Sequence, residues 1–366
     1  MKALFALGFR PLYLLAGAYA ALSVPLWTLQ YSGVLPAANA LWHAHEMLFG
    51  YAFAVIAGFL LTAVRNWTGL PTPSGAPLAA IAALWLAARL TAVVSLDAAT
   101  FVDVAFAIAL AWGIGRPMVA SRNRNWFFIL LVVALGAASF AFRYWAGYAL
   151  TIGLDIVLYV ITVMAGRVVP SFTNNAVPGA GARRIHGLEL AALGSILALV
   201  VLDALQLATF AAAVALAAAL IHAARLALWA PLATRGRPIL WILHLSYAWI
   251  VVHLALRGLA GLGFLPAVLA THALTVGAIG GITLGMMTRT SRGHTARPLA
   301  IGRAELWAYV LVQAAAVARV FLPLALPAAY RASVALSAAL WAAAFVVFVV
   351  VYYPILSRPR LDGKPG

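Results

Sequence analysis

The sequence contains no cysteine, and this absence removes several kinds of site. Without cysteine the chain cannot form a disulfide, attach haem covalently through a C-x-x-C-H motif, or hold an iron–sulfur cluster through thiolates. A thiolate-ligated haem is excluded for the same reason. A metal bound by this protein must therefore be held by histidine, methionine, carboxylate or backbone oxygen atoms.

Charged residues are also scarce, at 9% of the 366 residues, and only eight residues are acidic. Hydrophobic residues make up 66% of the chain, and the mean hydropathy is +1.03. This balance is typical of an integral membrane protein. The apolar stretches have the length of spanning helices and not of short alternating strands, which favours a helix bundle over a β-barrel. We therefore predict an all-α polytopic protein that forms one transmembrane bundle over residues 1–366.

About twelve segments are long and apolar enough to span a bilayer. Most of the breaks between them carry proline, glycine or charge. The weakest break separates the third segment from the fourth, where Asp97 is almost the only signal. The predicted segments are 11–30, 40–63, 77–96, 98–115, 126–143, 147–166, 187–206, 208–229, 238–257, 266–287, 301–323 and 332–356.

The net charge of +16 has a membrane explanation. Nearly all lysines and arginines fall in loops that twelve crossings place on one side. The exceptions are Arg143, Arg257 and Arg331 on the other side, and Arg89 and Arg319 within helices. The positive-inside rule then places both termini in the cytoplasm, and the same alternation supports the count of twelve. The charge therefore indicates the lipid bilayer as partner and no nucleic acid, for which the chain has no basic–aromatic patch.

The most informative stretch is residues 41–47, with His43, His45 and Glu46 at the start of a long apolar run. Ionisable groups within a membrane are rare and usually mark a ligand, an ion or a proton path. His43 and His45 are about 200° apart around a helix, so they cannot easily grip one metal. They could bind two separate metal centres on opposite sides of the helix. Alternatively, one histidine could be a metal ligand and the other could pair with Glu46. The simpler alternative is a pair of interfacial histidines at a helix start.

His272 lies at a similar membrane depth on the tenth predicted helix, near its outer end. It is followed by Gly277, Gly281 and Gly285, a stripe of small residues that predicts close approach of another helix. Because His272 faces away from that stripe, we expect both faces of this helix to be covered by protein. The alternative is a core histidine satisfied by a backbone carbonyl.

The ninth predicted helix carries His244 and His253, nine residues apart and about 180° around the helix. Both cannot face one cofactor. His244 lies nearer the middle of the membrane and has Tyr247 on its face, whereas His253 matches the outer depth of the other candidates. The residues themselves leave this choice open. His222, on the eighth helix, is a weaker candidate surrounded mainly by alanine.

Several motifs are missing. The chain has no phosphate-binding loop, no glycine-rich dinucleotide fingerprint and no H-E-x-x-H, because Phe49 stands where that motif needs its second histidine. The few acids inside the predicted helices do not indicate the paired carboxylates of a proton-driven pump. No inverted repeat with broken helices stands out, which weighs against a secondary transporter.

Short motifs spread over nearly the whole chain resemble the NnrS family. They are Gly8-Phe9-Arg10-Pro11, Trp42-His43-Ala44-His45-Glu46-Met47, Asn66-Trp67-Thr68-Gly69, Gly166-Arg167-Val168-Val169-Pro170, Leu243-His244-Leu245-Ser246-Tyr247, His272-Ala273-Leu274-Thr275-Val276-Gly277, Met287-Thr288-Arg289 and Gly293-His294-Thr295. Ser246 stands where the family usually has glycine.

The resemblance implies a twelve-helix protein of the bacterial inner membrane that contains haem and copper and is linked to tolerance of nitric oxide. It does not assign either metal to a particular histidine. Without cysteine, the haem would be haem b held most simply by imidazole, and copper would favour imidazole too. The implied site residues are the metal ligands His43, His45, His244 and His272, the catalytic candidate Glu46, and the cofactor-binding candidates Arg167 and Tyr247.

The resulting hypothesis is a protein that protects against nitric oxide by binding or reducing it at a buried metal site. Reduction would need electrons from a quinol or a redox protein. Two other hypotheses stay open. One is a transporter or exporter of a metal or nitrosyl species that uses the same histidines as transient ligands. The other is a passive binder that senses nitric oxide or copper without turnover.

Overall fold

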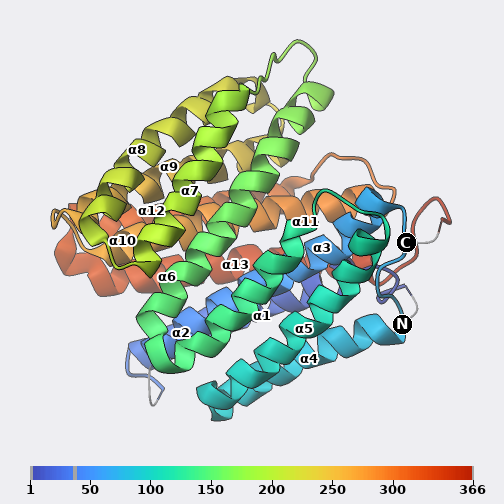
Figure 1. The fold of residues 1–366 in the computed structure, drawn as a ribbon, viewed down its shortest axis with the longest axis horizontal. Helices are drawn as coiled ribbons and strands as arrows, with labels where there is room; N and C mark the ends of the chain where they lie inside the picture. Colours follow the sequence, from blue (N-terminus) through green and yellow to red (C-terminus); the bar gives the residue numbers. More distant parts are fainter. Residues whose placement is uncertain (1–2, 36–38, 365–366) are drawn as a thin grey trace. The chain divides into compact units, whose positions relative to one another are not determined.

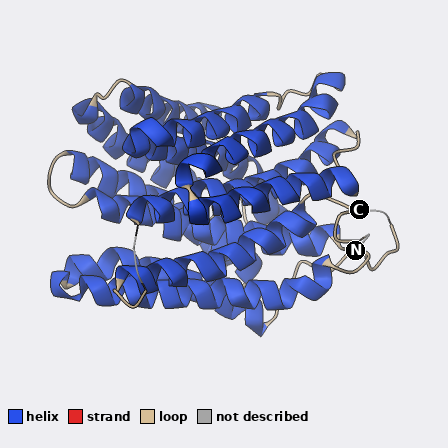
Figure 2. Ribbon diagram, turned by 90° about the horizontal axis from the view of Figure 1, so that it is seen from below, coloured by secondary structure: helices blue, strands red, loops and turns tan. Residues whose placement is uncertain are grey.

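The computed structural model describes residues 3–35 and 39–364, which are helical with no β-strand among them (Figure 1, Figure 2). Eleven helices in this part of the chain are long and apolar enough to cross a membrane. One of them, α6 (Phe127–Ala176), has 50 residues and non-helical backbone angles at Trp145. Since one crossing needs about 20 residues, α6 accommodates two predicted segments, 126–143 and 147–166. The all-α polytopic prediction is confirmed.

The chain divides into two compact units. Unit 1 comprises Met1–Ile156, Met287–Leu299 and Phe345–Gly366, and unit 2 comprises Val157–Met286 and Ala300–Ala344. Three helices contribute residues to both units: α6, α11 (Gly281–His294) and α13 (Tyr330–Leu356). The prediction of one bundle over residues 1–366 stays a prediction.

Unit 1 is built around one long helical rod, the continuous span Ala40–Thr68. Its most apolar 18-residue window is 89% buried, against 39% for the neighbouring α1. The rod begins as a short α-helix, continues as a π-helix and ends as a second α-helix. The elements of unit 1, apart from those shared with unit 2, are α1 (Phe9–Tyr31), α2 (Ala40–His45), the π-helix η1 (Glu46–Ala52), α3 (Phe53–Thr68), α4 (Ala76–Val94) and α5 (Leu96–Ala120).

Local chemistry explains where this rod begins and ends. The Asn39 side chain accepts hydrogen bonds from the backbone N–H groups of Leu41 and Trp42, which caps the start of α2. At the other end, Gly69 takes a left-handed conformation with φ of 69°, which ends α3. A Cβ at Gly58 would lie 2.9 Å from Tyr13, so a glycine here allows α1 and α3 to approach closely.

Unit 2 packs around α9 (Pro238–Gly261), whose most apolar window is 61% buried, against 22% for α7 (His186–Ala204). Pro238 at the first turn suits a helix start, because its missing N–H would have no partner there. The other elements are α8 (Ala208–Leu228), the 3-10 helix η2 (Pro231–Thr234), α10 (Ala267–His272), the π-helix η3 (Ala273–Gly280), α12 (Arg303–Ala325) and the 3-10 helix η4 (Pro327–Ala329).

The predicted glycine stripe lies against α9. An added Cβ would stand 2.4 Å from Trp249 at Gly277, and 2.0 Å from Ser246 at Gly281. At Gly285 it would stand 2.9 Å from the neighbouring side chains of α9. The predicted close approach of a second helix is therefore confirmed.

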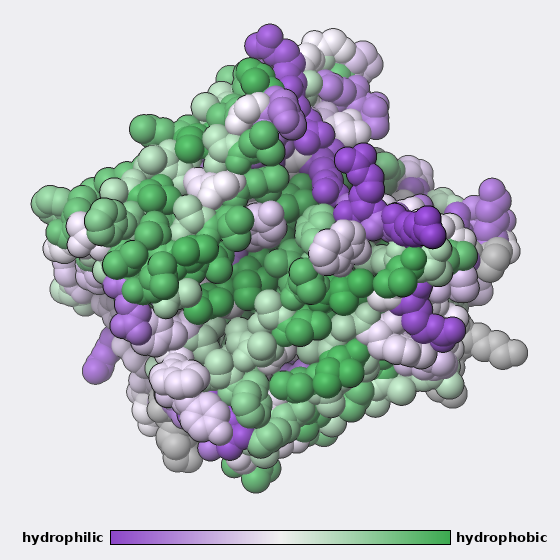
Figure 3. Space-filling view, in the orientation of Figure 1, coloured by the Kyte–Doolittle hydropathy of each residue, from purple (hydrophilic) through white to green (hydrophobic). Residues whose placement is uncertain are grey.

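Large apolar side chains remain exposed along the spanning helices. Leu22 of α1 is 70% exposed and Leu220 of α8 is 75% exposed. Hydrophobic side chains also cover much of the face shown in Figure 3. In water such surfaces would drive association, whereas in a bilayer they are the surface that the acyl chains contact.

Candidate functional site

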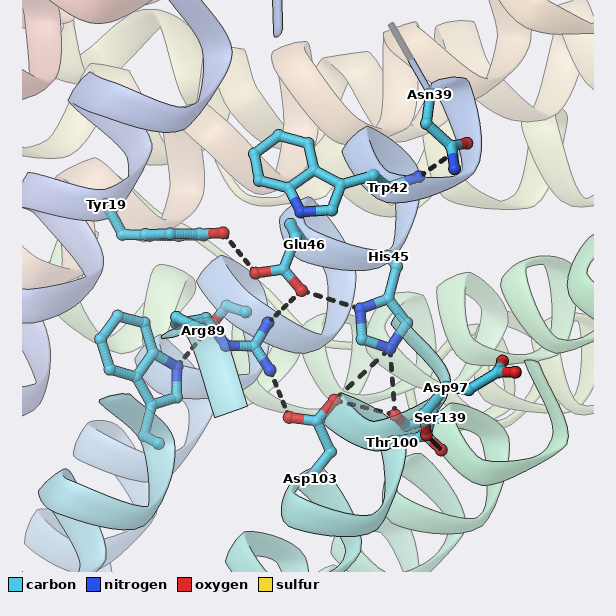
Figure 4. A network of polar contacts seen from close by, with 12 residues as sticks. Tyr19, Asn39, Trp42, His45, Glu46, Arg89, Asp97, Thr100, Asp103 and Ser139 are labelled. Atoms are coloured by element: carbon cyan, nitrogen blue, oxygen red, sulfur yellow. Dashed lines mark hydrogen bonds and ion pairs between the residues drawn. The ribbon is translucent and has the colours of Figure 1, made fainter. Parts of the chain in front are cut away.

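The predicted pair His45 and Glu46 lies in unit 1 at the junction of α2 and the π-helix η1. Both side chains are fully buried. Figure 4 shows that they join a polar network with side chains from α1, α4, α5 and α6. π-helical segments are rare and often occur at functional sites. The partners that these elements supply are Tyr19, Arg89, Asp103 and Ser139.

Glu46 accepts hydrogen bonds from three directions. Its Oε1 lies 2.9 Å from His45 Nδ1 and accepts from Arg89 Nη1 at 2.7 Å. Its Oε2 accepts from the hydroxyl of Tyr19. The carboxylate is thus neutralised and satisfied without water, as a buried charge must be. The predicted catalytic role of Glu46 stays a prediction.

Asp103 forms the second half of the network. It pairs with Arg89 Nη2 and accepts from Ser139 Oγ at 2.9 Å. Arg89 therefore bridges two buried carboxylates, those of Glu46 and Asp103. The sequence did not show that two of the few intramembrane acids, one on η1 and one on α5, lie in one cluster.

His45 lies between the two carboxylates. Its Nε2 is 3.3 Å from Ser139 Oγ and 3.4 Å from Asp103 Oδ2. Ser139 gives its own proton to Asp103, so it can only accept from the imidazole. Glu46 also only accepts. Both ring nitrogens of His45 therefore already have partners within the protein, and neither points into an open position.

His43 lies outside this network. Its ring stacks on Trp27, with centroids 4.3 Å apart and an interplanar angle of 24°. The side chain is half-buried. The two histidines thus have separate surroundings, as two residues on nearly opposite sides of a helix must.

In unit 2, His244 presents an arrangement different from that of His45. Its Nε2 lies 2.9 Å from Thr173 Oγ1, and that hydroxyl donates its proton to the carbonyl of Val169 at 2.9 Å. Thr173 can therefore only accept, and Nε2 must be the protonated nitrogen. The other nitrogen, Nδ1, is buried and has no hydrogen-bond partner.

His253, on the same helix, has the complementary tautomer. Its Nδ1 donates to the backbone carbonyl of Ala270 at 2.8 Å, because a carbonyl oxygen can only accept. Its Nε2 is buried and has no hydrogen-bond partner. The structure thus places a second open imidazole nitrogen at a residue for which the sequence left the choice open.

Tyr247 belongs to a second buried network. Its hydroxyl accepts from Arg225 Nη1 at 2.8 Å and lies 2.7 Å from His222 Nδ1. Arg225 also forms a two-pronged ion pair with Glu189, through Nε at 3.0 Å and Nη2 at 2.6 Å. A Cβ at Gly166 would stand 1.9 Å from Arg225 Nη2, so only glycine leaves room for this pair.

The remaining predicted residues lie elsewhere in unit 2. His272 ends α10, is half-buried and donates through Nδ1 to the carbonyl of Val268 at 2.7 Å. Arg167 is exposed. Across residues 3–35 and 39–364, no three histidine, aspartate or glutamate side chains gather in a way that could hold a metal ion.

The partners of His45 and Glu46 were missed at the sequence level. Arg89 and Asp103 both carried a signal, since each is a charged residue inside an apolar helix. Their pairing did not, because it joins residues 43 positions apart for Arg89 and Glu46. Tyr19 and Ser139 gave no signal of their own.

Family comparison adds to this geometry. Residues 3–360, nearly the whole chain, match the family described as NnrS protein. The chain belongs to the NnrS family. A search of curated proteins found no match. Membership makes this a membrane protein with a role connected to nitric oxide.

The donor atoms of this NnrS protein can be tested against an imidazole-held metal. A ligating histidine presents one lone pair and donates its other ring N–H to a protein acceptor. His244 and His253 both meet this requirement, with open atoms Nδ1 and Nε2 respectively. His45 does not meet it, because both of its nitrogens face acceptors.

Proposed function

We propose that this NnrS-family protein binds haem b and copper through buried imidazoles in the bacterial inner membrane and protects the cell by binding or reducing nitric oxide. Family membership supports the connection with nitric oxide. The absence of cysteine supports imidazole as the metal ligand. His43 and His272 remain ligand candidates in this proposal.

The single observation that carries the proposal is the open Nδ1 of His244. Thr173 accepts from Nε2 and is itself fixed by the carbonyl of Val169, so the tautomer and the ring orientation are set before any metal binds. Such anchoring is the usual companion of a metal-ligating histidine. A bound haem iron or copper would supply an open coordination position for nitric oxide.

The surroundings of His244 suit a site that excludes water. Thr173 is fully buried and His244 is 3% exposed. Arg225, one helix away, is neutralised by Glu189 and also donates to the Tyr247 hydroxyl, so it does not present an unpaired charge. Nitric oxide is small and uncharged, so it can reach a buried site through lipid. Reduction would need electrons from a membrane quinol or a redox protein.

The ends of the chain support the proposed orientation. Arg10, near the start of α1, donates through Nη1 to the carbonyls of Leu356 and Arg358, just where α13 ends. The two ends of the described chain therefore lie together in unit 1, as an even number of crossings requires. The positive-inside rule leads us to propose that this end faces the cytoplasm.

The proposal is tested by purifying the protein from cells supplied with haem precursor and copper. We expect a Soret band, bound copper, and a spectral change on anaerobic addition of nitric oxide. His244→Ala should lose one of the two metals, whereas His186→Ala, at an exposed position at the start of α7, should lose neither.

Two outcomes would overturn the proposal. A wild-type protein with neither a Soret band nor copper is not a haem or copper protein. If such a protein instead moves a metal or nitrosyl species across vesicles along a gradient, the transporter hypothesis replaces it. Steady consumption of nitric oxide with a supplied donor would separate reduction from binding alone.

A further inference from the structure

A segment rich in arginine closes one end of unit 1. After α13 the chain turns back across the ends of α1 and α11. The backbone N–H of Leu361 donates to the carbonyl of Thr295 at 3.3 Å, and Arg360 Nη1 donates to the carbonyl of His294 at 3.2 Å. The C-terminal segment, residues 357–364, is thus held by backbone carbonyls and guanidinium groups.

Five guanidinium groups gather around this segment, and we call them the arginine cluster. Arg10 binds the carbonyls of Leu356 and Arg358, and Arg297 Nη1 donates to the carbonyl of Thr295 at 3.4 Å. Arg10, Arg65 and Arg360 all act electrostatically on the imidazole of His294. The members of the cluster are Arg10, Arg65, Arg297, Arg358 and Arg360.

The positive charge of the cluster is poorly compensated. Asp362 pairs with Arg360, and that pairing holds the pKa of the aspartate below its usual range. Arg65, Arg297 and Arg358 pair with no carboxylate in the part of the chain that the structure describes. Burial and the charges of Arg292 and Arg358 lower the pKa of Arg297. Carbonyl oxygens satisfy guanidinium hydrogens but leave their charge in place.

The cluster lies at the ends of helices that are long and apolar enough to cross a membrane, where lipid headgroups would be. Arg10 is the second residue of α1, His294 is the last residue of α11, and Arg358 follows two residues after α13 ends. All three helices are parts of spans that an apolar bilayer core would surround. Arg358 is exposed, while Arg297 and Arg360 are half-buried, so some of these groups can be reached from outside.

We propose that the arginine cluster binds the phosphate of an anionic phospholipid headgroup and that this lipid holds the C-terminal segment in place. A phosphate accepts several charge-assisted hydrogen bonds from guanidinium groups. Basic pockets beside spanning helices on the cytoplasmic side are suited to such headgroups. A bound headgroup supplies the negative charge that the cluster lacks.

Trypsin gives a direct readout of the C-terminal segment. Proline follows Arg358 and Lys364 and blocks cleavage there, so Arg360 is the one site in this segment that trypsin can cut. The wild-type protein is placed in nanodiscs of phosphatidylcholine alone, or of phosphatidylcholine with phosphatidylglycerol. A third sample contains phosphatidylcholine with added inorganic phosphate at the same ionic strength. Mass spectrometry follows loss of residues 361–366.

We expect phosphatidylglycerol, but not inorganic phosphate, to slow cleavage in the wild-type protein. One basic side chain near an anionic surface contributes about 1 kcal/mol, so each arginine removed should lower this protection about fivefold. The test variant is Arg297→Gln with Arg358→Gln. The matched control is Arg235→Gln with Arg237→Gln, two exposed arginines beside η2 with the same change of charge.

Three results would overturn the proposal. Equal protection of the test and control variants by phosphatidylglycerol would mean that the cluster is not the lipid site. Equal protection by inorganic phosphate would show a phosphate site with no preference for lipid. If neither phosphatidylglycerol nor inorganic phosphate slows cleavage, the C-terminal segment is held in place without a bound anion. Arg10 is left unchanged because it anchors the segment directly.

Discussion

Each unit contains a short α-helix that continues directly into a π-helix, and the side chains at the two junctions differ. In unit 1, the six-residue α2 ends at His45 and passes into a π-helix that begins with Glu46. In unit 2, the six-residue α10 ends at His272 and passes into a π-helix that begins with Ala273. The last residue before the π-helix is therefore a histidine in both units, but an acidic residue follows it only in unit 1.

That difference decides the surroundings of each histidine. With Glu46 beside it, His45 enters a cluster of charges in which both nitrogens are occupied. With Ala273 beside it, His272 turns back to its own helix and donates to Val268. In unit 2, His244 and His253 on α9 and His222 on α8 each have a buried ring nitrogen with no hydrogen-bond partner. His45 of unit 1 thus belongs to a network of charges, whereas the metal binding proposed above would use histidines of unit 2.

The sharpest way to break this comparison is to remove Arg89. Arg89→Met would leave the buried carboxylates of Glu46 and Asp103 without the guanidinium group that pairs with both of them. Breaking a buried ion pair on one side typically costs about 3–5 kcal/mol. We expect a large drop in the thermal unfolding midpoint, measured in detergent or nanodiscs.

A double variant provides the control for this prediction. Arg89→Met with Asp103→Asn removes one charge of each sign and leaves Glu46 paired with His45. It should be more stable than Arg89→Met alone, because the two changes are coupled through one network. If the single and double variants have the same unfolding midpoint, Arg89 and Asp103 are not coupled through one charge network.

Unit 2 is tested through the ion pair between Arg225 and Glu189. Gly166→Ala would place a Cβ 1.9 Å from Arg225 Nη2 and 2.6 Å from Glu189 Oε2. Forcing extra volume into a packed interior costs about 1–3 kcal/mol. We expect a lower unfolding midpoint, with a smaller drop than for Arg89→Met.

The matched control is Gly194→Ala in α7, where an added Cβ would meet nothing within 4 Å. Alanine is favoured over glycine inside a helix by up to about 1 kcal/mol. This variant should therefore be at least as stable as the wild type. A destabilised Gly194→Ala would mean that the loss at Gly166 is a general effect of glycine replacement.

A finer test concerns the anchor of His244. Thr173→Val keeps the shape of the side chain but removes the oxygen that accepts from Nε2. Losing such an anchor lowers metal affinity by about 10–100-fold. We expect weaker metal binding in a chelator competition, with His244 still present. Unchanged metal affinity would mean that Thr173 does not support the proposed site. It would also weaken the inference that the tautomer of His244 prepares its Nδ1 for a metal.

Much of the fold follows from short-range signals. The predicted segment 208–229 corresponds to α8 (Ala208–Leu228), because apolar length alone defines it. The uncertain boundary near Asp97 lies at Ser95, whose side chain caps α5 by accepting from the backbone N–H of Ala98. Proline, glycine and capping residues act locally, so their effects can be predicted from sequence.

The candidate site was less predictable for two physical reasons. Helical wheels assume 100° per residue, and the π-helices at Glu46–Ala52 and Ala273–Gly280 depart from that spacing just where the side chains matter. The pairing of Arg89 with Asp103 depends on how two helices pack, which no local pattern records. Glu46 and His45 were found because charge in an apolar run is conspicuous, but their partners were not.

The smallest expected effect is the change in metal content on replacing His45, and this measurement distinguishes the two units most directly. In His45→Gln, the buried carboxylates lose the imidazole that contacts both of them, so stability should fall. No metal should be lost, however, because both nitrogens of His45 already have partners within the protein. Haem and copper are measured per folded protein, with His244→Ala as the variant that should lose metal. A His45→Gln protein that stays folded without haem or copper would place a metal ligand in unit 1 and reverse the assignment of binding to unit 2.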